Sequence, residues 1–128
     1  MKYCVLIGRI FYSLIFITSV LVHFSKHTIE FAASKGVPLA AILVPLAGSM
    51  ALLGGLSILV GYNARWGAWL VVAFLVPVTL TMHKFWGLAD PAAAQTQYIM
   101  FMKNLSMLGG ALLIAYFGSG PLSLDKES

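Results

Sequence analysis

The chain has 128 residues, of which 60% are hydrophobic and only 9% are charged, and its mean hydropathy is +0.92. A water-soluble domain of this length needs a larger polar shell, so this composition excludes that class and predicts an integral membrane protein. Eight basic and four acidic residues give a net charge of +4. The basic residues are scattered, which excludes the basic cluster typical of nucleic-acid binding.

The first apolar stretch, residues 5–22, is long enough to cross a bilayer, which takes about 20 apolar residues. Lys2 gives it only a weak positive start and no small-residue cleavage site follows it, so we expect a retained helix rather than a signal peptide. Arg9 interrupts its apolar surface. Cys4 is the only cysteine of the sequence, which excludes a Cys-x-x-Cys redox pair within the chain.

Residues 26–36 mix charged and apolar side chains and are too polar to span a membrane. They predict a short interfacial helix in the headgroup region, or alternatively a lid over the bundle. Pro38 is expected to open the second span, residues 39–61, because the first turn of a helix tolerates a missing N–H. Glycine and asparagine in residues 61–65 predict a tight turn, so the second span and the third, residues 66–82, should form an antiparallel hairpin.

Small residues line one face of the second span. Ala47, Ala51 and Gly55 recur there every four residues. This spacing is typical of membrane helices that approach one another closely, because small side chains bring the two backbones together. We therefore expect this face to pack against a neighbouring helix.

Asp90 and Pro91 form a helix-start signal, since aspartate caps free N–H groups and proline suits the first helical position. A fourth helix should begin near Pro91, include the last span, residues 98–117, and end at a glycine cap.

The four spans together predict one all-α domain, residues 1–118. Its fold is expected to be a membrane-embedded antiparallel four-helix bundle with a short interfacial helix between helices one and two. A loosely ordered tail, residues 119–128, should follow.

Polar side chains gather at the end of the predicted bundle opposite the termini. They are His23, His83, Trp86, Lys103 and Asn104. Ionisable groups within a membrane are costly, so Lys103 and Arg9 should each face the bundle or extend toward the headgroups.

These side chains predict a pocket for the carbonyl oxygens of a quinone or another lipophilic ligand. The expected ligand-binding residues are Lys103, Asn104, Trp86 and Arg9. His83 and His23 are the candidate catalytic groups, because imidazole donates or accepts a proton near neutral pH. Alternatively, these residues only anchor helices at the headgroups. His23 and His27, with His83, suggest a metal or haem site, but they lack acidic or thiolate neighbours and we predict no metal.

Several groups of residues follow a pattern seen in known membrane proteins. They are Gly8-Arg9-Ile10, Leu53-Gly54-Gly55-Leu56, His83-Lys84-Phe85-Trp86, Asp90-Pro91 and Lys103-Asn104-Leu105. With this pattern, residues 5–117 resemble the DoxX family. The resemblance implies a four-helix protein of the bacterial inner membrane with cytoplasmic termini. It also implies quinone-linked oxidation of sulfur compounds, or a place in oxidoreductase assemblies that manage oxidative stress.

The chain departs from that family at one position and leaves its orientation undecided. Many members carry a glutamate shortly before the Gly-Gly of the second helix, where this chain has Ser49-Met50-Ala51-Leu52. If that acid pairs with the arginine of helix one, Arg9 lacks its partner. Basic residues tie between the two sides, so the positive-inside rule gives no orientation. They are Lys2, Arg9, Arg65 and Lys126 on one side, and Lys26, Lys35, Lys84 and Lys103 on the other.

The leading prediction is a small subunit or accessory protein of a quinone-linked membrane redox system. Its expected partners are the lipid bilayer, membrane or soluble redox proteins and a second copy of the chain, whereas nucleic acid is not expected. Whether the chain is itself an enzyme stays open. The alternatives are a non-catalytic protein that assembles or stabilises a larger complex, and a small-solute carrier.

Overall fold

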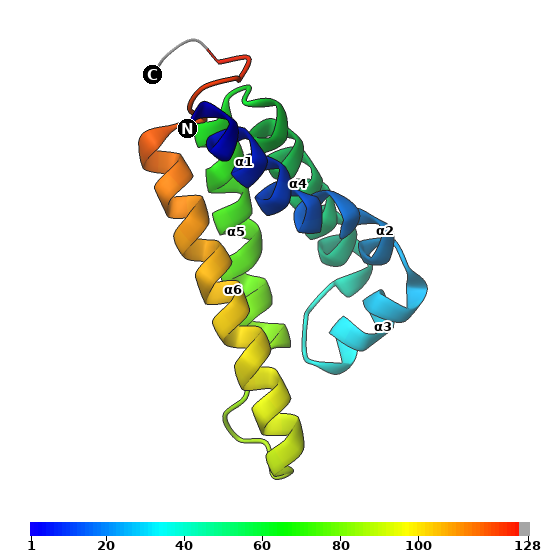
Figure 1. The fold of residues 1–128 in the computed structure, drawn as a ribbon. Coiled ribbons are helices and arrows are strands. Elements are labelled where there is room, and N and C mark those ends of the chain that lie inside the picture. Colours follow the sequence, from blue (N-terminus) through cyan, green and yellow to red (C-terminus); the bar gives the residue numbers. More distant parts are fainter. Residues whose placement is uncertain (126–128) are drawn as a thin grey trace.

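The computed structural model describes residues 1–125, and this part of the chain contains helices and no strands (Figure 1). The helices are α1 (Lys2–Thr18), α2 (Val20–His23), α3 (Lys26–Ser34), α4 (Ala40–Val60), α5 (Ala64–Met82) and α6 (Pro91–Phe117). Four segments are long and apolar enough to cross a membrane: α1 with α2, α4, α5 and α6. The predicted all-α fold with four spans is therefore confirmed.

The N-terminus and the segment that follows α6 lie at one end of the molecule, which we call the terminal end (Figure 1). Successive long helices run antiparallel, with α4 packed on α1 and α5, and α6 packed on α5. The helices are close together at the terminal end. At the opposite end, here the splayed end, α2, α3 and the start of α4 diverge from the last part of α5 and from α6 (Figure 1).

Glycine brings α4 and α5 into close backbone contact. A Cβ atom added to Gly54 would lie 2.7 Å from the carbonyl oxygen of Gly67, too close for any side chain. The predicted small-residue face is also packed, since Ala51 is fully buried and Gly55 lies against Phe16 of α1. Small residues thus hold α4 between its two neighbours, as expected for membrane helices.

The first span is interrupted near its end. Thr18 Oγ1 donates to the Leu14 carbonyl oxygen at 2.8 Å, and Ser19 Oγ donates to that of Phe16 at 2.8 Å. Hydroxyl groups that bond back to the preceding turn compete with the helix and bend it. The break separates α1 from the single turn of α2 and places His23 at the splayed end.

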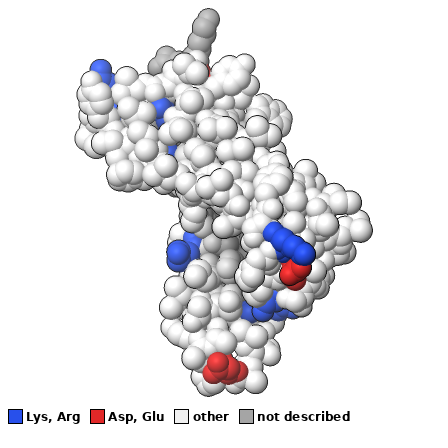
Figure 2. All heavy atoms as spheres, turned by 90° about the vertical axis from the view of Figure 1, so that its right-hand side faces the viewer, with Lys and Arg blue, Asp and Glu red and all other residues white. Residues whose placement is uncertain are grey.

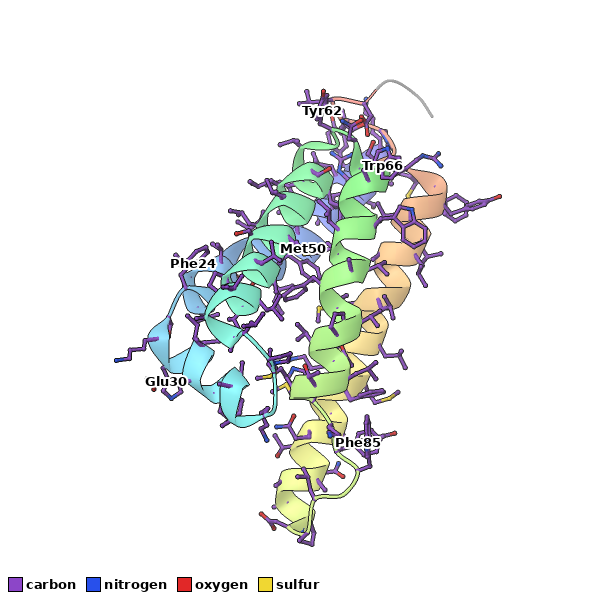
Figure 3. The ribbon with its side chains drawn as sticks, turned by 180° about the vertical axis from the view of Figure 1, so that it is seen from behind. Phe24, Glu30, Met50, Tyr62, Trp66 and Phe85 are labelled. Atoms are coloured by element: carbon purple, nitrogen blue, oxygen red, sulfur yellow. The ribbon has the colours of Figure 1, made fainter. Side chains whose placement is uncertain are left out.

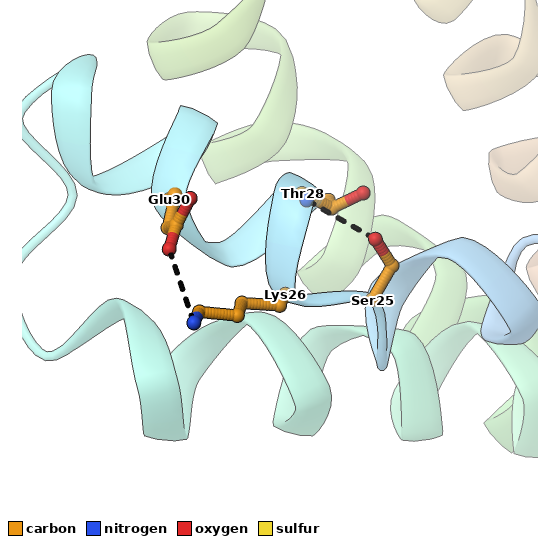
Figure 4. Close-up of polar contacts among 4 residues, drawn as sticks. All are labelled: Ser25, Lys26, Thr28 and Glu30. Atoms are coloured by element: carbon orange, nitrogen blue, oxygen red, sulfur yellow. Dashed lines mark hydrogen bonds and ion pairs between the residues drawn. The ribbon is translucent and has the colours of Figure 1, made fainter.

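The predicted short helix between the first two spans is present as α3. Ser25 Oγ caps it by accepting from the Thr28 N–H at 3.3 Å, and Lys26 pairs with Glu30 at 3.9 Å (Figure 4). Both charged side chains are exposed, so the pair stabilises the helix little. α4 begins at Ala40 rather than at Pro38, because Leu39 has a left-handed backbone with φ 50° and interrupts the chain between them.

α6 has the bounds expected from its signals. Asp90 accepts from the Ala92 N–H at 3.3 Å, Pro91 occupies the first turn, and Gly118 ends the helix with φ 83°. At 27 residues and about 1.5 Å per residue, α6 is about 40 Å long and exceeds a hydrocarbon core of about 30 Å.

Candidate ligand-binding site

A cavity of about 320 Å³ lies between α4 and α5 in the half of the molecule toward the splayed end, and α2 and α3 contribute to its wall. The wall is mostly apolar and includes Val44, Ala47, Met50, Phe74, Val78 and Met82. Met50 extends from α4 toward α5 (Figure 3). Figure 2 shows the molecule from the side of α3: this face carries few charged groups and is hollowed between its two halves.

His23 places an imidazole in this apolar wall. Its Nδ1 lies 2.8 Å from the Ser19 carbonyl oxygen. A carbonyl oxygen only accepts, so Nδ1 carries the hydrogen, and Nε2 of the neutral ring is an acceptor. The ring packs edge-on against Phe74, with centroids 5.4 Å apart, and it lies against Gly48. A Cβ atom at Gly48 would collide with the His23 side chain, so this glycine makes room for the histidine.

Two threonines complete the polar part of the wall. Thr81 Oγ1 donates to the Pro77 carbonyl oxygen at 2.7 Å, so its hydrogen is used and its lone pairs remain available. Thr28 contributes a second hydroxyl. Pro77 has no N–H, so the carbonyl oxygen of Ala73, one turn earlier in the same wall, lacks its usual helical donor.

Of the predicted site residues, only His23 lines the cavity. His83 lies just beyond the end of α5, half-buried, with Nδ1 3.0 Å from Gln97 Oε1 of α6. Trp86 belongs to an aromatic cluster in which its ring centroid lies 5.2 Å from that of Phe85 and 6.0 Å from that of Phe101. That cluster holds the connection after α5 against α6.

Lys103 and Asn104 do not share a pocket, although they are neighbours in the sequence. Asn104 is buried and its Nδ2 donates to Thr79 Oγ1 at 3.1 Å, which joins α6 to α5. Lys103 is exposed on the outer surface of α6. Successive residues of an α-helix point about 100° apart, so one faces the bundle while the other faces away. The structure thus does not bring these residues together around the cavity, and the role of each as a site residue stays a prediction.

Arg9 lies at the terminal end, far along the bundle from His83. Its Nη1 donates to the carbonyl oxygens of Ser119 and Pro121, at 2.8 and 2.9 Å, and its Nη2 donates to that of Leu122 at 2.5 Å. Only 5% of Arg9 is exposed. Arg9 therefore has partners without the missing glutamate, and it does not belong to a pocket with Lys103 and Trp86.

Comparison with known proteins gives the family. The family model described as DoxX matches residues 4–84, which include every residue that lines the cavity. The chain belongs to the DoxX family. It is similar to the inner membrane protein YqjF of Escherichia coli, 32% identical over 124 residues that cover 95% of this chain and 89% of that protein. It is also similar to the inner membrane protein YphA of Escherichia coli, 31% identical over 100 residues that cover 78% of this chain and 71% of that protein.

No solved structure gives a significant match to the chain. The family, the two inner-membrane relatives and the four apolar helices make this DoxX-family chain a multi-pass inner membrane protein.

Residues 119–125 of the DoxX-family chain pack against the terminal end, whereas the sequence predicted a loose tail there. Asp125 accepts from the N–H groups of Asn63 and Ala64 at 2.7 and 3.2 Å, so a residue from the tail caps the start of α5. Leu124 also donates from its backbone to the Val60 carbonyl oxygen at 3.1 Å. Residues 126–128, among them the Lys126 that entered the charge comparison, lie outside the described residues.

The environment of Asp125 lowers the pKa of its carboxyl group below the ordinary 3.8. Burial raises this pKa, but the N–H groups of Asn63 and Ala64, the Ser119 hydroxyl and the charge of Arg65 together lower it by a larger amount. A carboxyl group whose pKa is lower in the folded state stabilises that state above its unfolded pKa. The stabilisation is lost as the pH falls through the folded pKa.

This linkage predicts how the stability depends on pH. Above about pH 4, the thermal midpoint of the wild type should exceed that of the D125N variant by a constant amount, because the charged carboxylate holds the start of α5. Below that pH the difference should shrink as the carboxylate is protonated. Melting curves of the two proteins in detergent at a series of pH values measure it, and a difference that stays unchanged into the acid range would contradict the assignment.

Sequence reasoning missed most of the cavity. Thr81 and Pro77, four residues apart near the end of the third span, belong to the wall, but no sequence motif assigned them to a site. Gly48, which makes room for His23, is likewise part of no such motif. Pro77 was the available signal, because a proline inside a membrane helix leaves the carbonyl oxygen four residues earlier without its usual N–H donor.

Proposed function

We propose that this chain is a small DoxX-family component of a quinone-linked membrane redox system and that it binds a lipophilic molecule in the cavity between α4 and α5. Electrons would pass to or from a partner protein, while this chain holds the molecule. His23 is the proposed proton-exchanging group. The proposal replaces the pocket expected around His83 and Lys103, because those residues lie outside the cavity.

The cavity itself supports this proposal. Small-molecule sites are concave, largely apolar and carry a few polar groups that fix orientation, and their volumes are typically about 300–1,000 Å³. The cavity here has about 320 Å³, an apolar wall, one imidazole and two hydroxyl groups. It lies within a bilayer-spanning bundle, so a hydrophobic molecule can enter from the lipid.

A binding experiment with a blocked cavity tests the proposal. The A73F variant places a ring in the wall, whereas A41F places the same ring at an exposed position of α4 that does not line the cavity. Decylubiquinone and its reduced form, kept anaerobic, are titrated into the purified proteins in lipid nanodiscs. We expect saturable binding of at least one form by the wild type and by A41F, and a loss of about tenfold or more in A73F, because the ring occupies the ligand's space.

The thermal midpoints of both variants serve as the folding control. Ala73 is exposed on the surface of α5, so A73F should melt close to A41F. Equal binding by all three proteins would contradict the cavity as the site.

A second function, assembly of a larger complex, is favoured by Lys103. This lysine lies exposed within the apolar α6 span and pairs with no acidic group in residues 1–125. A charge on the outer face of a membrane helix is costly unless it reaches the headgroups or meets a polar partner. If the purified protein binds neither form of the quinone but is extracted together with a larger membrane complex, and K103M abolishes that association, the assembly function holds instead.

A further inference from the structure

We infer that the cavity selects a ligand whose polar head donates a hydrogen bond, such as a phenol or a quinol, over one that only accepts, such as a quinone carbonyl or an ether. The inference rests on the proposed function and specifies the chemical class of the ligand. The reason is that most hydrogen-bond donors of the wall already donate to carbonyl oxygens of the protein, whereas several acceptors remain free.

Acceptors outnumber donors in the polar part of the wall. His23 Nδ1–H is held by the Ser19 carbonyl oxygen at 2.8 Å, which leaves the Nε2 lone pair for a ligand. The Thr81 hydroxyl group donates its hydrogen to the Pro77 carbonyl oxygen at 2.7 Å, and its two lone pairs remain free to accept. The Ala73 carbonyl oxygen has lost its helical donor, because Pro77 has no N–H.

One hydroxyl group of the wall, that of Thr28, can still donate a hydrogen bond to a ligand. Thr28 binds Ser25 only through its backbone N–H, and its hydroxyl group makes no hydrogen bond to any of residues 1–125. An acceptor head group could therefore be satisfied at Thr28 alone. Near His23, Thr81 and Ala73 it would face other acceptors and stay unpaired, and an unpaired polar group in an apolar site is costly.

The expected selectivity is that of one neutral hydrogen bond. Such a bond changes an equilibrium by roughly 3- to 10-fold, given its usual net strength. The apolar wall contacts the ring and the alkyl chain that both ligands share. The ratio of their affinities therefore reports the difference between the head groups, which is the hydroxyl hydrogen of the phenol against the methyl group of the ether.

A pair of ligands that differ only in the donor tests the inference. We use 4-nonylphenol and 4-nonylanisole, which share the ring and the chain, and the ether has a methyl group in place of the hydroxyl hydrogen. Their dissociation constants are measured with the protein in nanodiscs at one fixed pH, after correction for partition into lipid. We expect the phenol to bind roughly 3- to 10-fold more tightly than the ether.

Two variants locate the acceptor. H23F keeps an aromatic ring against Phe74 and removes the nitrogen, and T81V keeps the shape of the side chain and removes the hydroxyl group. H23F and T81V should each reduce the phenol-to-ether ratio, because each removes one acceptor, while the affinity for the ether stays unchanged. If H23F fails to fold, judged by its thermal midpoint, T81V alone still tests the inference.

The outcomes separate this inference from the function on which it rests. Equal affinities of phenol and ether in the wild type, both lost in A73F, would overturn the donor selection and leave the cavity as a lipophilic site filled without a polar preference. Affinities that A73F does not change would overturn the site itself. A ratio that H23F and T81V both leave intact would also overturn the inference, because the hydrogen bond would then lie elsewhere.

Discussion

Replacing Arg9 with methionine should lower the free energy of unfolding by about 3 kcal/mol and detach the C-terminal segment. The arginine donates to the carbonyl oxygens of Ser119, Pro121 and Leu122. A hydrogen bond from a charged group contributes about 1.5–3 kcal/mol, and these three share one side chain and are not additive. Methionine fills similar space but leaves those carbonyl oxygens without a donor.

The control for this prediction is the other arginine at the terminal end. Arg65 Nη1 donates to the Tyr116 carbonyl oxygen at 2.7 Å in an exposed position. R65M should therefore lower stability by less than about 1 kcal/mol. Thermal unfolding in detergent compares the two variants, and limited proteolysis of the C-terminal segment reports its detachment. Equal destabilisation by R9M and R65M would show that the buried contacts of Arg9 do not hold the segment.

The second large effect is expected where α4 meets α5. Gly54→Val should destabilise the protein by about 3 kcal/mol, because the added atoms would overlap the Gly67 carbonyl oxygen and Val71 Cγ2. The first is backbone and cannot move without separating the two helices. The thermal midpoint in detergent measures the loss.

Gly109 provides the matched control, because a Cβ atom there would meet nothing within 4 Å. G109A should leave the protein as stable as the wild type or stabilise it by up to about 1 kcal/mol, since alanine favours a helix more than glycine does. If G54V and G109A melt alike, α4 and α5 are not held by close glycine contact.

Arg9 and Asp125 together show how this DoxX-family chain handles polar groups at the edge of a membrane. Arg9 draws the chain after α6 inward, and Asp125 then reaches the free N–H groups of Asn63 and Ala64 at the start of α5. A helix start carries partial positive charge, which a carboxylate stabilises. The segment thereby joins α1, α5 and α6 at the terminal end, while the splayed end has no comparable polar clasp among residues 1–125 and holds the cavity.

The spans, the α6 start at Asp90–Pro91 and the turn at Gly61 and Asn63 were predictable because each depends on neighbouring residues. A run of apolar side chains, a capping carboxylate and a left-handed glycine act within one or two turns of the chain. α3 was expected from its mixed pattern of charged and apolar residues alone.

The candidate site was less predictable, since it depends on which faces of separate helices meet. As neighbours in the sequence, Lys103 and Asn104 were expected at the same depth in the membrane. Only the packing of α6 on α5 decided that Asn104 faces the bundle and that Lys103 faces outward. The partners of Arg9 lie more than a hundred positions along the chain, beyond any local pattern.

The amino-acid sequence by itself determined that this protein is embedded in a bilayer, how many times it can cross and which stretches of the chain form the crossings. These properties follow from hydrophobicity and hydrogen bonding along a continuous stretch of chain. Only the tertiary structure decided that the bundle closes at one end and opens at the other, and that His23 rather than His83 faces the resulting cavity. Those outcomes depend on contacts between helices, and the glycines and prolines that permit the contacts act only once the helices have come together.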